Sequence, residues 1–137
     1  MDKFVKNFIG MSLIYLTAAS VLGVVMLGHP SLLSLKFVHS HLNLLGWVSM
    51  MIYGVGYHVL PRFAGRPLKH PKMGETQFWL ANAGLIGMLL FSVVSFYNPE
   101  AGIYRGLTVA FGLVEVFSVF LFLYNMFVTL FPRTETA

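Results

Sequence analysis

The chain contains no cysteine and little charge. Without cysteine, disulfides, thiolate metal sites, iron-sulfur clusters and covalent c-type haem attachment are excluded. Charged residues make up 10% of the 137 residues, compared with roughly a quarter of an ordinary soluble domain. Because 57% of the residues are hydrophobic, a compact domain of this length would lack the polar residues needed to cover its outside. The composition therefore predicts that lipid surrounds the chain.

Four apolar segments are long enough to cross a hydrocarbon layer of about 30 Å as helices, which takes roughly 20 residues each. They run from Phe8 to Leu27, Val38 to Leu60, Phe78 to Tyr97 and Leu107 to Phe131. The gaps between the segments contain Pro30, then Pro61 with Gly65, Pro67 and Pro71, then Asn98-Pro99, as expected where the chain leaves the membrane. The sequence predicts an all-α, integral membrane four-helix bundle, with residues 1–137 forming a single transmembrane domain.

Positive charge is divided unequally between the two ends of these predicted helices. If the helices alternate in direction, one end carries Lys3, Lys6, Arg62, Arg66, Lys69, Lys72 and Arg133. The other end carries only Lys36 and Arg105. Because cytoplasmic loops are enriched in Lys and Arg, both termini are predicted to be cytoplasmic, in the inner (cytoplasmic) membrane. The net charge of +4 then faces anionic lipid of the bilayer, and no nucleic-acid partner is expected.

Histidine is absent from three of the predicted helices and concentrated in the second, which contains His39, His41 and His58. Ionisable side chains are costly in lipid, so three imidazoles in one span call for buried partners, a water-filled cavity or a metal. On a helical wheel of about 100° per residue, His39 shares a polar, glycine-notched face with Asn43 and Gly46. His41 points nearly the opposite way.

This pattern is compatible with haem binding. Neutral imidazole is a common axial ligand of haem iron, and a flat macrocycle needs small residues where it lies against a helix. His39 or His41, with Gly46 one to two turns deeper, would meet both requirements. In the alternative interpretation the histidines bind neighbouring carbonyls and the glycines allow close helix packing. The residue types alone leave both interpretations open.

The second predicted helix carries an extended motif. It reads His39-Ser40-His41-Leu42-Asn43-Leu44-Leu45-Gly46-Trp47 and ends with Gly56-Tyr57-His58-Val59-Leu60-Pro61. This motif resembles helix II of subunit I in the haem-copper oxidase superfamily, with nitric oxide reductases and C-type cytochrome oxidases as the most similar branches. In that family a helix II histidine near the outer surface is an axial ligand of the low-spin haem b. The resemblance implies that His41 is this ligand, whereas the helical wheel favours His39. The residues expected around the cofactor are Asn43, Gly46, Trp47 and His58.

The resemblance also indicates what one copy of the chain lacks. The family's large subunit has twelve helices, which look like three groups of four, and its copper ligands lie in later helices. This chain resembles one such group and has no histidine in its third and fourth predicted helices. Haem b is therefore the predicted cofactor, with copper as the second candidate metal. A homo-oligomer, either a dimer or a trimer, would supply the second axial histidine from another copy.

Two classes of function follow from these observations. The first is a membrane b-type haem protein that transfers electrons from a respiratory-chain donor or binds nitric oxide or oxygen. The second is a non-catalytic membrane subunit or metal-handling protein beside a respiratory complex. No enzymatic turnover is assigned, because the ligands of a second metal are missing. Glu115, the one carboxylate well inside a predicted helix, is either a proton-transfer group, an anchor for an imidazole, or a protonated acid hydrogen-bonded between helices.

Overall fold

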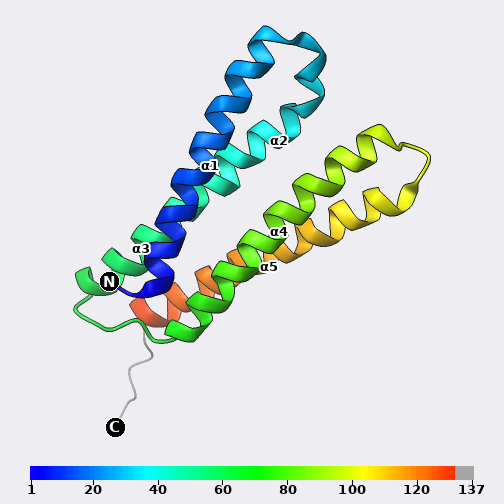
Figure 1. Cartoon of the computed structure of the whole chain (residues 1–137). Helices are drawn as coiled ribbons and strands as arrows, with labels where there is room; N and C mark the ends of the chain where they lie inside the picture. Colours follow the sequence, from blue (N-terminus) through cyan, green and yellow to red (C-terminus); the bar gives the residue numbers. More distant parts are fainter. Residues whose placement is uncertain (132–137) are drawn as a thin grey trace.

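The computed structural model describes residues 1–131, and all regular structure within that range is helical (Figure 1). The α-helices are α1 (Lys3–Gly28), α2 (Lys36–His41), α3 (Met50–Phe63), α4 (Pro71–Tyr97) and α5 (Gly102–Leu130). A 3₁₀-helix, η1 (Pro30–Leu35), leads into α2, and a π-helix, η2 (Leu42–Ser49), joins α2 to α3. Pro30–Phe63 is thus one span, and four spans are long and apolar enough to cross a membrane. The predicted number of spans is confirmed, while Arg133 lies outside the described residues.

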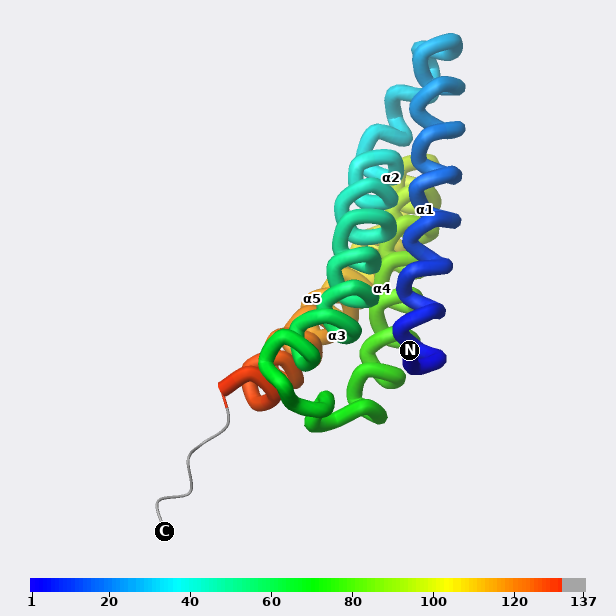
Figure 2. Tube along the Cα trace, turned by 90° about the vertical axis from the view of Figure 1, so that its left-hand side faces the viewer, coloured from blue at the N-terminus to red at the C-terminus, as the bar shows by residue number. Residues whose placement is uncertain are grey.

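The four spans form two antiparallel hairpins. In the first, α1 packs along η2 and α3, and in the second α4 packs along α5, which is the most extensive helix contact of the fold. The hairpins converge where α1 begins, α3 ends, α4 begins and α5 ends, and this end is called the amino end below (Figure 1). A view turned by 90° shows α2 and α3 following one another as a single span despite the different helix type between them (Figure 2).

Several predicted boundaries were wrong. The third span begins at Pro71 and not at Phe78, because proline suits the first turn of a helix, where its missing N–H would have no partner. The second span continues through Pro61, which was expected to end it, and stops at Phe63. Pro61 lies in the last turn, where it removes a single backbone donor, and its carbonyl accepts the N–H of Arg66 at 2.9 Å. Hydropathy locates the apolar middle of a span but misses its polar end turns.

Aromatic side chains fill the core near the amino end. The ring of Phe8 in α1 packs edge-on against Tyr53 of α3 and Phe78 of α4, with centroids 5.6 and 5.1 Å apart. Phe122 of α5 approaches the rings of Tyr53 and Tyr57 to 4.8 and 5.1 Å. Such pairs contribute about 0.5–1.5 kcal/mol each beyond their buried area. This cluster therefore joins all four spans.

Glycine allows α4 and α5 to approach closely. A Cβ atom built on Gly84 would lie 2.7 Å from the backbone nitrogen of Glu115, and one on Gly87 would lie 2.3 Å from the ring of Phe111. Small residues at such crossings let the backbones of membrane helices come into direct contact. The contact also sets the register of the hairpin, with Gly84 opposite Glu115.

The loop from α3 to α4 is held against α5 by hydrogen bonds. The side chain of Asn125 accepts from the N–H of His70 at 3.3 Å and donates to its carbonyl at 2.9 Å. The hydroxyl of Thr129 accepts from the N–H of Lys69 at 3.1 Å. These bonds satisfy backbone groups directly before α4 and hold the loop that links the two hairpins against α5.

Candidate functional site

His39 faces α1 and uses both of its ring nitrogens. Nδ1 lies 3.1 Å from the carbonyl of Ala19 and, since a carbonyl can only accept, it must carry the proton. Nε2 is then the acceptor, and the side-chain nitrogen of Asn43 lies 3.3 Å from it. The ring also packs on Gly23, where an added Cβ would come within 2.9 Å of Cε1. In this arrangement His39 has no free nitrogen for iron.

His41 is arranged differently and is half-buried. Its Nδ1–H donates to the carbonyl of Phe37 at 2.8 Å, and its ring lies on the ring of Phe37 with centroids 3.9 Å apart. Within residues 1–131, Nε2 of His41 makes no hydrogen bond. A backbone carbonyl that binds Nδ1–H fixes the tautomer in which Nε2 can bind a metal. The geometry of His41 is therefore that of an available ligand.

His39 and Gly46, which were predicted to share one face with Asn43, both contact α1. The Cβ position of Gly46 lies 2.8 Å from the side chain of Tyr15, while Tyr53 packs on Phe8. The notch at Gly46 is thus filled by a tyrosine of the same chain. For this glycine the structure supports the close-packing interpretation.

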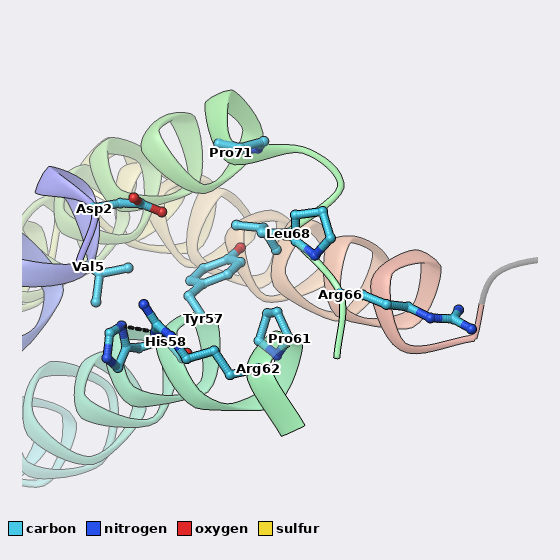
Figure 3. A pocket seen from close by; sticks show the side chains of 10 residues that line it. Asp2, Val5, Tyr57, His58, Pro61, Arg62, Arg66, Leu68 and Pro71 are labelled. Carbon is cyan, nitrogen blue, oxygen red and sulfur yellow. Dashed lines mark hydrogen bonds between the residues drawn. The ribbon is translucent and has the colours of Figure 1, made fainter. Parts of the chain in front are cut away.

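The other residues expected around a cofactor do not all lie together. Asn43 donates to the carbonyl of His39 at 2.9 Å, so it supports that histidine. Trp47 is half-buried in η2. His58 lies near the amino end, where the guanidinium of Arg62 donates to its Nδ1 and its carbonyl (Figure 3). His58 therefore belongs to a separate region.

The π-helix begins directly after His41. Residues 42 to 49 wind with wider turns, and the hydroxyl of Ser49 donates to the carbonyl of Leu44, five residues earlier, at 2.9 Å. Such segments are rare and often occur at functional sites, because they change how side chains before and after them are aimed. Here the segment separates the imidazoles of α2 from the aromatic core of α3.

No group of three or more metal-binding side chains comes together within the described part of the chain. His39 and His41 both lie in α2 but face in different directions, since one contacts α1 and the other contacts Phe37. A single copy therefore presents one free imidazole nitrogen at this place.

Sequence reasoning recognised Glu115 but missed the polar residues near it. Glu115 and Ser118 are both buried on the face of α5 that meets α4, and Gln77 is fully buried on α4. The spacing of three residues between Glu115 and Ser118 was the available signal, because it places them on one side of a helix.

Part of the chain is similar in sequence to part of a known protein. Over 49 residues, 35% of the chain, it is 41% identical to a protein described as "Cbb3-type cytochrome c oxidase subunit CcoN1" from Stutzerimonas stutzeri. The match covers 10% of that subunit, so the chain spans a small fraction of this relative's length. No family model and no solved structure matches. The finding supports a partial relationship to a haem-copper oxidase subunit.

Proposed function

We propose that the chain is the subunit of an oligomeric b-type haem protein of the inner membrane, which transfers electrons or binds a small gas such as nitric oxide or oxygen. The carrying observation is the geometry of His41, whose Nδ1–H is bound by the Phe37 carbonyl and whose Nε2 makes no hydrogen bond within residues 1–131. The partial similarity to an oxidase subunit supports the same interpretation. His39, with both nitrogens engaged, is assigned a packing role.

The residues around His41 would hold the cofactor and tune it. When bound, haem supplies an iron that changes oxidation state by one electron or binds a gas. The carbonyl of Phe37 fixes the imidazole tautomer and the orientation of the ring. The ring of Phe37, which is 41% exposed, adds an apolar surface beside the ligand. A respiratory-chain donor would deliver the electron.

Purified protein is expected to be red, with a Soret band and one equivalent of iron for each bound haem. Absorption spectroscopy together with elemental analysis of the same sample provides the measurement. A colourless protein would favour the second function, a non-catalytic or metal-handling subunit beside a larger respiratory complex. If elemental analysis finds copper and no iron, His41 would be assigned as a ligand of copper, the alternative metal.

The second axial ligand is expected to come from another copy of the chain. His41 cannot be joined by His39, which contacts Ala19 in its own chain, and the other three spans contain no histidine. A dimer with one shared haem, or a trimer, would supply the second axial ligand of the iron. Native mass in detergent, measured with the haem-to-protein ratio, tests this arrangement. A monomer that retains bis-histidine haem would refute it.

Both termini are proposed to be cytoplasmic, because Lys3, Lys6, Arg62, Arg66, Lys69 and Lys72 gather at the amino end. Since the chain lacks cysteine, single substitutions report the sidedness of each loop. Ala64→Cys suits the α3–α4 loop better than a change at Gly65, whose φ of 65° disfavours other residues.

An impermeant maleimide added to intact cells is expected to label Glu100→Cys, in the α4–α5 loop. Ala64→Cys is expected to react only after the membrane is opened. Both positions are exposed, so a difference in labelling reports the side of the membrane. The reverse pattern would contradict the proposed orientation.

A further inference from the structure

A set of polar side chains is buried inside the bundle without partners. Among the described residues, the unpaired buried atoms belong to Tyr57, Gln77, Glu115 and Ser118, and both oxygens of Glu115 are included. Glu115 is 3% exposed, and Gln77 and Ser118 are 0% exposed. A buried polar group without a hydrogen bond is costly, so such groups in native proteins are normally satisfied by water or by a bound ligand. Their grouping here indicates an internal site.

Glu115 and Ser118 lie one turn apart on α5, and both are buried where this helix meets α4. Glu115 lies opposite Gly84, and one turn closer to the amino end the same antiparallel register brings Ser118 opposite Ala81. Three residues of helix correspond to an axial distance of about 4.5 Å. One bound water can bridge a gap of this size between a hydroxyl and a carboxyl group.

Gln77 and Tyr57 continue this series toward the amino end. The register places Gln77 opposite Phe122, and the ring of Phe122 lies 5.1 Å from the ring of Tyr57. Tyr57 also lines a cavity of about 300 Å³ at the amino end, together with polar residues that include Asp2 and Arg62 (Figure 3). Tyr57, Gln77 and Ser118 are therefore spaced along the bundle between this cavity and Glu115.

The surroundings of Glu115 lack a positive charge. Within residues 1–131 the fully buried side chains include no Lys, Arg or His. The titratable groups near the carboxyl are the hydroxyls of Tyr15 from α1 and Tyr53 from α3, and Tyr15 itself donates to Asn82 of α4 at 2.7 Å. From α4, Gly84 contacts the backbone of Glu115. A permanent negative charge at this depth would be expensive.

We propose that Glu115 is a proton-binding site within the membrane, hydrated by internal water and loaded from the amino-end cavity past Tyr57, Gln77 and Ser118. In the loading step, a hydronium in the cavity gives its proton through internal water beside these side chains to a carboxylate oxygen of Glu115, and water remains behind. No bond other than O–H bonds forms or breaks, and no oxidant is needed. The two unpaired oxygens distinguish this site from an acid locked by helix–helix hydrogen bonds. The inference does not depend on haem.

Infrared difference spectroscopy of reconstituted membranes during a change of pH tests the proposal. The wild-type protein is expected to show a carboxylic-acid C=O band that titrates and that shifts in D₂O. Glu115→Gln should lose this band, while the exposed Glu75→Gln and Glu100→Gln should retain it. A titrating band that survives in Glu115→Gln would overturn the assignment, as would a wild-type band that neither titrates nor shifts. Should Glu115→Gln fail to fold, the wild-type titration and the altered band of Glu115→Asp decide the question.

The route is tested by the rate at which the same band shifts after transfer to D₂O. Tyr57→Phe and Ser118→Ala are expected to slow the shift without changing its final size. Tyr97→Phe, at the opposite end of the bundle, is the matched control and should leave the rate unchanged. An equal rate in Tyr57→Phe and wild type would overturn the proposed entry from the amino-end cavity.

Discussion

His41→Ala is expected to abolish the Soret band of the purified protein, whereas His39→Ala should retain it. The reason is the different use of the ring nitrogens, because in the part of the chain that the structure describes Nε2 of His41 makes no hydrogen bond, while both nitrogens of His39 are engaged. Loss of the hydrogen bond to Ala19 should instead lower the stability of His39→Ala by about 1 kcal/mol. Absorption spectra and thermal unfolding of the two variants separate the effects.

Adding imidazole to the His41→Ala protein distinguishes loss of the ligand from loss of the fold. The free ligand should enter the space left by the side chain and restore part of the Soret band, which a misfolded protein would not do. His58→Ala is the control, since His58 lies about 25 Å along the helix from His41. A colourless His39→Ala protein beside an unchanged His41→Ala protein would transfer the ligand role to His39. An unchanged spectrum in the double variant would remove the haem site from this helix.

Gly84→Ala is expected to destabilise the α4–α5 hairpin by about 1–3 kcal/mol, a cost typical of overpacking. The added methyl group would lie 2.7 Å from the nitrogen and 3.0 Å from the Cα of Glu115. These are backbone atoms, so relief requires the two helices to move apart. Unfolding in mixed detergent micelles, followed by circular dichroism, provides the measurement.

Gly112→Ala is the matched control for this substitution. It also adds one methyl group at the α4–α5 contact, but its nearest neighbour is the Met88 sulfur at 3.6 Å, an ordinary contact distance. Its stability should equal or slightly exceed that of the wild type, since alanine favours a helix more than glycine does. Equal stability of the Gly84→Ala and Gly112→Ala proteins would show that the hairpin is not closely packed at Gly84.

Local sequence patterns predicted the four spans, but they predicted the ends of the spans less accurately. The turns from Pro71 to Gln77 are polar enough to fall outside a hydropathy window, and Pro61 was interpreted as a stop. Both segments are helical because backbone hydrogen bonding continues beyond the apolar middle of each span. Proline is tolerated where it falls in an end turn.

At the candidate site, too, local sequence patterns predicted some features, and others depended on how the helices pack. Periodicity correctly placed His39 and Gly46 on a common face, and it could not reveal that Ala19 and Tyr15 of α1 would occupy that face. The family motif favoured His41, and the hydrogen bond to Phe37 provides the physical support for that choice. A helical wheel also assumes a constant twist, which the π-helix does not have.

The sequence by itself determined that the chain has four membrane-spanning segments and where its imidazoles and its one deeply placed carboxylate fall along them. These properties depend on composition and order, because lipid selects long apolar helices and penalises each polar residue in them. Only the tertiary structure decided which nitrogens of His39 and His41 are engaged, and that Glu115, Ser118 and Gln77 are buried without hydrogen-bond partners among residues 1–131. Those properties depend on which helix faces which, and that is decided by close contacts such as Gly84 on Glu115 between residues far apart in the chain.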